Sequence, residues 1–182
     1  MTRIYAVLAV LSVVLLAVTF VLGSSLDGAS ARVDETSQKW MRTHFLLGTT
    51  SALVVVLVQS IAATYFVGTS RWCKEVVETY GLDTKLAERS QRLKRRAFPW
   101  AVVSMLTIVG VIAAGAAGDP ATARANTEMW NVIHFIAACC GATLIAATYL
   151  VVWNRIRENQ AVIDAIVAHV REIRLAKGLE VA

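Results

Sequence analysis

The chain has 182 residues, of which 57% are hydrophobic and only 17% are charged. Soluble globular domains usually carry about 25% charged residues, so this composition excludes an ordinary soluble fold. The formal net charge is +5, from 18 Lys and Arg residues against 13 Asp and Glu residues.

Four apolar segments contain no Asp, Glu, Lys or Arg. They cover residues 4–22, 45–67, 98–117 and 132–152. Each is close to the roughly 20 residues that an α-helix needs to cross a hydrocarbon core about 30 Å thick. The sequence therefore predicts an all-α polytopic membrane protein. We expect a single membrane domain over residues 1–182, built as a four-transmembrane-helix bundle of two consecutive helical hairpins.

The first apolar segment has two interpretations. Arg3 precedes it, and the later run 29–31 (Ala-Ser-Ala) has the small-residue form of a signal-peptide cleavage site. Signal peptides, however, have apolar regions of only about 7–15 residues. We therefore expect the segment to be retained as a membrane span; cleavage would leave three spans. The polar residues 24–39 that follow predict an irregular outer loop.

The basic residues predict the orientation of the chain. Arg3, the central segment 68–97 and the tail 154–182 together carry most of the 18 Lys and Arg residues. The positive-inside rule therefore predicts a cytoplasmic (inner) membrane location with both termini and the central segment in the cytoplasm. Within this basic set, four residues beside the third span are expected to contact anionic lipid headgroups: Arg92, Lys94, Arg95 and Arg96. This topological role explains the positive charge and gives no reason to propose nucleic acid as a partner.

Both cytoplasmic segments have helical sequence patterns. Residues 71–80 are expected to prolong the second span as far as Gly81, and residues 84–97 to lead into the third, with Pro99 near that span's first turn. After Trp153, apolar residues follow three- and four-residue steps as far as Gly178, with Asn159 interrupting the series: Ile156, Ile163, Ile166, Val170 and Ile173. This stripe predicts packing on the central segment, a coiled coil with a second copy, or a helix at the membrane surface.

Two of the predicted spans begin with the same motif, Trp-x-x-x-His. It places Trp40 four residues before His44, and Trp130 four residues before His134. Tryptophan is a common anchor at membrane interfaces, whereas an ionisable residue inside a span is costly and is a functional candidate. The two helices run in the same direction, so the imidazoles could meet as axial ligands of haem b or as ligands of a metal ion. The alternative is a hydrogen-bonded or pH-responsive pair.

Small and polar residues near the histidines leave the same alternatives open. Gly48 and Ala138, one turn further along each helix, would admit a flat macrocycle or equally permit tight helix contact. Haem propionates would need polar partners, for which Arg42, Thr43 and Asn131 are the candidates. His169 lies in the polar tail and is expected to be exposed.

The spans contain seven other notable polar residues: Gln59, Ser60, Thr64, Tyr65, Thr143, Thr148 and Tyr149. We expect them to form hydrogen bonds between helices, with a quinone or small-ligand pocket as the alternative. The identical runs 61–65 and 145–149, together with the repeated Trp-x-x-x-His motif, suggest internal duplication. Cys73, Cys139 and Cys140 lack metal-binding spacing and are expected to be packing residues.

No arrangement of residues typical of catalysis is present in the sequence, so we expect the protein not to be an enzyme. The first functional hypothesis is a non-catalytic accessory or scaffold subunit of a membrane complex. Its cytoplasmic helices would contact membrane-protein partners or a second copy of the chain. The alternative hypothesis is an electron-transfer protein that holds haem b between His44 and His134 near the outer face.

Overall fold

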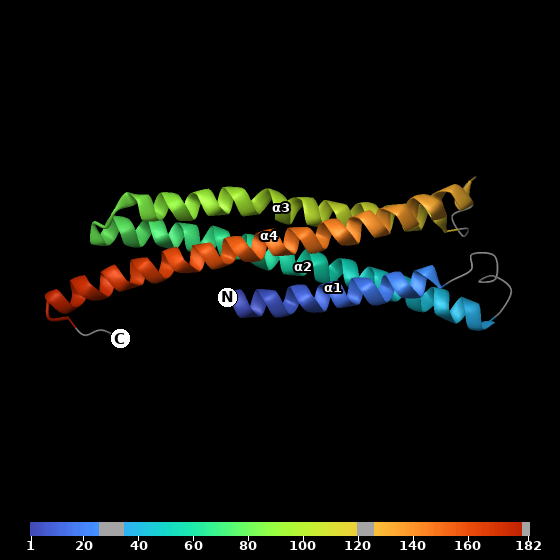
Figure 1. Ribbon diagram of the computed structural model, residues 1–182, viewed down its shortest axis with the longest axis horizontal. Coiled ribbons are helices and arrows are strands. Elements are labelled where there is room, and N and C mark those ends of the chain that lie inside the picture. The colour runs from blue at the N-terminus through green and yellow to red at the C-terminus, as the bar shows by residue number, and fades with distance from the viewer. Residues whose placement is uncertain (26–34, 120–125, 180–182) are drawn as a thin grey trace.

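The computed structural model describes residues 1–25, 35–119 and 126–179. All regular secondary structure in these ranges is helical, and it forms four helices (Figure 1): α1 (Thr2–Ser24), α2 (Glu35–Tyr80), α3 (Thr84–Gly118) and α4 (Thr127–Ala176). Each of the four is long and apolar enough to cross a membrane. The predicted all-α class is confirmed, and the length and composition of the four helices suggest a multi-pass membrane protein.

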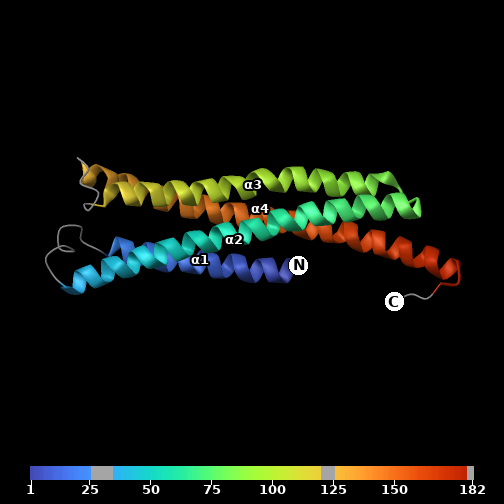
Figure 2. The same ribbon diagram turned by 180° about the vertical axis from the view of Figure 1, so that it is seen from behind.

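The helices form an elongated bundle. Helix α1 contacts α2 and α4, and α3 contacts the same two helices, so α1 and α3 lie on one diagonal of the bundle. Helices α2 and α4 lie on the other diagonal and also touch each other. Opposite views in Figures 1 and 2 show that α1 covers only part of α2 and α4, and that it begins near the middle of the bundle. The part of the bundle beyond the start of α1 is therefore formed by α2, α3 and α4.

We name the two ends of the bundle by their residues. The histidine end comprises residues 19–25, 40–50, 111–119 and 127–140, where α1 and α3 finish and α2 and α4 start. The tail end comprises residues 68–97 and 154–176, where α2 turns into α3 and α4 finishes. The bundle has four helices at the histidine end and three at the tail end.

Glycines end two of the helices where the sequence predicts them to. Helix α2 finishes at Tyr80, and Gly81 follows with a φ of +64°. Helix α4 finishes at Ala176, and Gly178 has a φ of +67°. Only glycine adopts this left-handed conformation without steric cost, so it commonly terminates helices. Asp83 then caps α3 by accepting a hydrogen bond of 2.9 Å from the backbone nitrogen of Lys85.

Two expectations about helix boundaries are wrong. Helix α2 begins at Glu35, so residues 35–39 are helical rather than part of an irregular loop. The run 29–31 of the cleavage hypothesis lies outside the described residues. Pro99 lies inside α3, because the cap at Asp83 starts this helix well before the apolar segment. Proline has no N–H, so α3 lacks one helical hydrogen bond at that position.

Helix α1 presents a polar seam to the rest of the bundle. Its buried residues are Tyr5, Ala9, Ser12 and Thr19, which recur at the spacing of one helix face. Its other faces expose apolar side chains such as Val10, which is 62% exposed. Lipid is as apolar as valine, so burying those faces would contribute little to helix association in a bilayer. Polar contacts and close packing therefore attach α1 to the bundle.

The tail of α4 packs on its own chain, as the first of the three sequence-based alternatives predicts. Ile156 and Ile166 are fully buried, and Ile163 and Val170 pack against the same core. Asn159 does not interrupt this face, because its side chain is also fully buried. The stripe is thus continuous, with a polar member at its centre.

Candidate functional site

The two histidines of the repeated motif meet across the bundle. His44 lies on α2 and His134 on α4, and their ring centroids are 6.4 Å apart with an interplanar angle of 74°. Both side chains are half-buried. Helices α2 and α4 run in the same direction on one diagonal of the bundle. Each histidine lies near the start of its helix, so the two rings come close together. The juxtaposition that the sequence suggested is therefore present in the fold.

A backbone carbonyl of a neighbouring helix holds each ring. The Nδ1 atom of His44 lies 3.1 Å from the carbonyl oxygen of Thr19 on α1. The Nδ1 atom of His134 lies 3.0 Å from the carbonyl oxygen of Val111 on α3. A carbonyl only accepts hydrogen bonds, so each Nδ1 must carry the hydrogen and donate it. In a neutral imidazole this leaves Nε2 with a free lone pair, and neither Nε2 has a hydrogen-bond partner among the described residues.

A glycine on the same neighbouring helix provides the space for each ring. A Cβ atom built on Gly23 would lie 2.5 Å from Cε1 of His44, and one built on Gly115 would lie 2.9 Å from Cε1 of His134. Both distances are too short for a real side chain, so each imidazole occupies the place where a side chain would otherwise stand. In both helices the glycine follows the carbonyl residue by one helical turn. The two halves of the chain thus hold their histidines in the same way.

These two glycines are not among the residues that the sequence predicts for the site, although a signal for them is present in the sequence. Gly23 directly follows the first apolar segment and Gly115 lies two residues before the end of the third, each close to the histidine at the start of the next segment. Gly48, which the sequence analysis considered instead, faces α1: a Cβ atom there would lie 3.8 Å from Cγ2 of Thr19. Its small size therefore serves the contact between α1 and α2 rather than the space between the two rings.

The histidine end is less tightly packed than the rest of the bundle. The first buried residue of α2 is Ser51 and the first of α4 is Gly141, so the turns that carry the histidines contain no buried residue. Phe20 and Phe135 close one side, with ring centroids 5.7 Å apart between α1 and α4. The rings thus lie in a region of apolar but incompletely covered side chains.

The other residues predicted around the histidines have separate positions. Trp40 is 51% exposed, whereas Trp130 is half-buried. Thr43 donates its hydroxyl hydrogen to the carbonyl of Lys39 on its own helix. The side chain of Asn131 packs against Gly118, and Arg42 is exposed.

Four of the seven polar residues predicted to link the helices do so: Gln59, Tyr65, Thr148 and Tyr149. Ser12 on α1 and Tyr149 on α4 share a bond of 2.8 Å between their hydroxyl oxygens. Gln59 accepts from the Tyr5 hydroxyl at 3.5 Å and donates to Thr148 at 3.4 Å, which links three helices. For the alternative prediction of a ligand pocket at these polar residues, the structure has only an open surface groove of about 530 Å³ on α2 among the described residues. Ser60, Thr64 and Tyr65 form part of its lining. Thr143 bonds only to the carbonyl of Cys139 on its own helix.

Cys73 and the basic run both belong to the tail end of the bundle, apart from the two histidines. Cys73 is fully buried, and burial raises the pKa of its thiol. Among the described residues, no group of three or more His, Cys, Asp and Glu side chains is arranged to hold a metal ion. In the basic run, Arg92 pairs with Glu88 at 3.3 Å, while Arg95 and Arg96 are exposed. His169 is exposed and bonds to the carbonyl of Ala165 on its own helix, at 2.7 Å.

Comparison with known proteins adds no relative. No protein-family model, curated protein or solved structure matches the chain. The fold and the site alone therefore define the class: an all-helical bundle of four apolar helices with a pair of facing histidines at one end.

Proposed function

We propose that this chain is an integral membrane protein that binds haem b between His44 and His134 and transfers electrons through it. The observation that carries this proposal is the pair of facing imidazoles, each held through Nδ1 and each with a free Nε2. A metal bound about 2 Å from one nitrogen of each of two imidazoles would separate their ring centroids by about 6 Å. The measured separation is 6.4 Å.

The number of ligands supports haem over a bare metal ion. A bare zinc or copper ion usually takes three or four protein ligands, whereas the porphyrin already supplies four nitrogens and leaves two axial positions. The described residues provide two histidines here and no third His, Cys, Asp or Glu. The carbonyls of Thr19 and Val111 also match the outer partners that fix the tautomer of metal-bound histidines. When bound, haem iron supplies one-electron redox chemistry.

We propose that the bundle lies in a cytoplasmic membrane with both termini inside, so that the histidine end faces outward. The distribution of Lys and Arg supports this orientation. We also propose that the two halves arose by duplication. The equivalent carbonyl, glycine and histidine positions support duplication at the histidine end. The identical runs 61–65 and 145–149 have different surroundings, because Tyr65 accepts from Asn159 whereas Tyr149 bonds to Ser12.

The test is the visible spectrum of protein purified from cells supplied with haem, recorded before and after reduction with dithionite. We expect a reducible haem band that His44→Ala and His134→Ala each abolish. His169→Ala is the matched control, because His169 is exposed in the tail, and this variant should keep the full band. A colourless wild-type preparation with the expected helical content would contradict the proposal.

A second candidate is the accessory-subunit hypothesis, which one observation favours. The last turns of the chain expose large apolar side chains: Val167 is 51% exposed, Leu175 59% and Leu179 53%. By the proposed topology these residues lie in water rather than lipid, where such side chains often mark a partner surface. Purification in mild detergent should then recover a stoichiometric partner that Val167→Ser and Leu175→Ser release together. Recovery of the wild-type chain alone would count against this candidate.

A further inference from the structure

We propose a second binding site, for the phosphate group of an anionic phospholipid, in a groove between the start of α1 and the tail of α4. The groove has a volume of about 400 Å³. Its polar lining comes from Thr2 and Arg3 on α1 and from Arg157, Gln160 and Asp164 on α4, and Trp153 forms an apolar part of the wall. This site lies at the opposite side of the membrane from the histidines and does not depend on haem.

Within the part of the chain that the structure describes, the two arginines of the groove have no carboxylate partner. Elsewhere at the tail end, several arginines pair with an acidic residue on their own helix, as Arg71 does with Glu75 at 2.8 Å and Arg155 with Glu158 at 2.8 Å. Among the described residues, Arg3 and Arg157 form no ion pair, although Asp164 lines the same groove. The Asp164 carboxylate instead accepts a hydrogen bond from Gln160 at 3.0 Å. The groove thus offers two guanidinium groups from two different helices to an anion.

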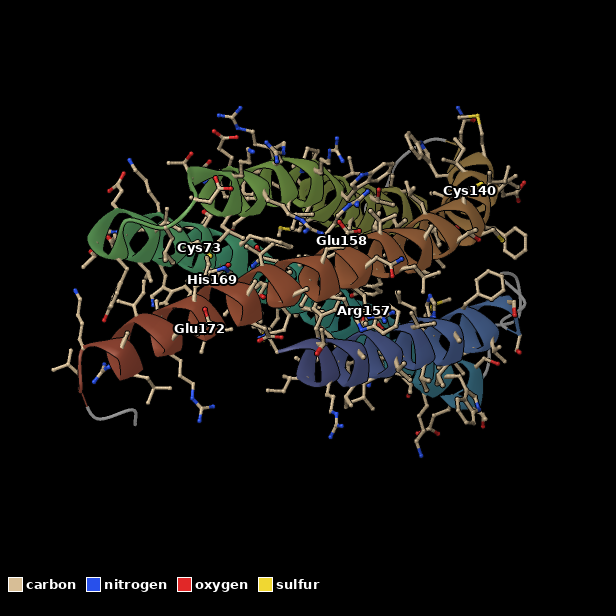
Figure 3. All side chains as sticks on the ribbon, turned by 60° about the vertical axis from the view of Figure 1, so that its left-hand side comes forward. Cys73, Cys140, Arg157, Glu158, His169 and Glu172 are labelled. Carbon is tan, nitrogen blue, oxygen red and sulfur yellow. The ribbon has the colours of Figure 1, made fainter. Side chains whose placement is uncertain are left out.

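A neighbouring tryptophan positions one of these guanidinium groups. The central carbon of the Arg157 guanidinium lies 4.8 Å from the centroid of the Trp153 ring, one helical turn earlier. Figure 3 shows Arg157 on α4 where that helix passes α1. A cation over an indole face is attracted by the ring and remains free to donate hydrogen bonds outward. Guanidinium also matches phosphate oxygens with two parallel donors, which favours an oxyanion such as phosphate over a spherical anion such as chloride.

The depth of the groove favours a lipid over a free phosphate ion. It lies beside the start of the first predicted span, at residue 4, and the end of the fourth, at residue 152. In the proposed topology this is the level of the cytoplasmic headgroups. Val10 lies on the same face of α1 as two residues that line the groove, one turn beyond Ala6 and two turns beyond Arg3, and it is exposed. On α4, Leu150 is exposed one turn before Trp153. These side chains are 62% and 65% exposed. A phosphate in the groove would thus continue directly into an apolar surface suited to acyl chains.

The experiment measures phosphatidylglycerol bound to the full-length chain by native mass spectrometry from detergent micelles. Electrostatic contributions of each basic residue near a lipid surface predict that Arg3→Gln with Arg157→Gln weakens binding roughly thirtyfold. The matched control is Arg171→Gln with Lys177→Gln, which removes the same charge from exposed positions of the tail outside the groove and should change binding by less than about threefold. Circular dichroism of both double variants checks that the helices remain formed.

Each outcome decides between the sources of the phosphate group. Phosphatidylglycerol retained by wild type, with phosphatidylcholine lost and inorganic phosphate unable to compete, supports a lipid site. Displacement by inorganic phosphate at equal concentration would assign the groove to a free phosphate ion and overturn the lipid proposal. Equal weakening in the two double variants would overturn the site itself, because general surface charge would then explain the binding.

Discussion

The two ends of the bundle use buried polar groups in opposite ways. At the tail end, Asn159 accepts a hydrogen bond from Ser90 at 2.8 Å and donates to Thr69 at 2.9 Å and Tyr65 at 3.3 Å. Its amide is therefore fully engaged by side chains of α2 and α3. At the histidine end, each imidazole uses one nitrogen for a backbone carbonyl and leaves the other without a partner in the described structure.

The number of hydrogen-bonding positions left open therefore distinguishes a polar group that stabilises the fold from one that can bind a ligand. A buried polar group whose donors and acceptors are all satisfied fixes the packing of its helices and has nothing left for a ligand. A half-buried group with one open lone pair does little for packing and is available for coordination. The tail end is accordingly well packed around Ile156 and Ile166, and the histidine end is not.

The largest effect on folding should come from Asn159→Ala. This change removes bonds to buried Ser90 and to half-buried Thr69 and Tyr65, so we expect the free energy of unfolding in mixed micelles to fall by about 3 kcal/mol. Asn154→Ala, five residues earlier on an exposed position, is the matched control and should shift it by no more than about 0.5 kcal/mol. Haem binding should survive Asn159→Ala at temperatures where the variant is folded. A loss of haem without a loss of stability would break the division between the two ends.

A smaller effect on stability, but a larger one on the site, is expected from Gly23→Ala. The new Cβ would lie 2.5 Å from the His44 ring, so the imidazole must move. We expect about 2 kcal/mol of destabilisation from overpacking and a shifted or weakened haem spectrum. Gly115→Ala should do the same less severely, because its contact with His134 is 2.9 Å.

Gly68→Ala provides the matched control for these two changes. Gly68 lies in α2 with nothing within 4 Å of a built Cβ, so alanine there should raise stability by up to about 1 kcal/mol through helix propensity alone. Thermal unfolding and the dithionite spectrum measure both quantities on all three variants. An unchanged spectrum in Gly23→Ala would show that the position of His44 is not set by α1.

The smallest effects concern single hydroxyl groups in the membrane. Ser12→Ala removes the bond to Tyr149 and should destabilise the bundle by about 0.6–2 kcal/mol. Ser104 is equally buried, but its hydroxyl has no partner among the described residues. Ser104→Ala should therefore leave stability unchanged or raise it by about 1 kcal/mol. The free energy of unfolding in mixed micelles should fall for Ser12→Ala but not for Ser104→Ala. A fall for both variants would indicate a partner for Ser104 outside this chain.

Much of the fold follows from local sequence signals. Uncharged runs of about 20 residues define spans because backbone groups in lipid must be satisfied within a helix. Gly81 and Gly178 mark helix ends because few other residues adopt their backbone conformation. The start of α2 at Glu35 was missed, since polar residues form helices and loops alike when no apolar period distinguishes them.

From the residues alone it follows that the chain is helical, that four segments are apolar enough to span a membrane, and that two histidines stand at the start of matching segments. The folded bundle is needed to show that the histidines lie close together, that Gly23 and Gly115 give them room, and that Asn159 belongs to the core. The physical reason is that helix periods and turn residues act within a few positions of the chain. Which faces of α2 and α4 meet depends instead on packing and hydrogen bonds between residues far apart in sequence, as in the contact of Ser90 with Asn159.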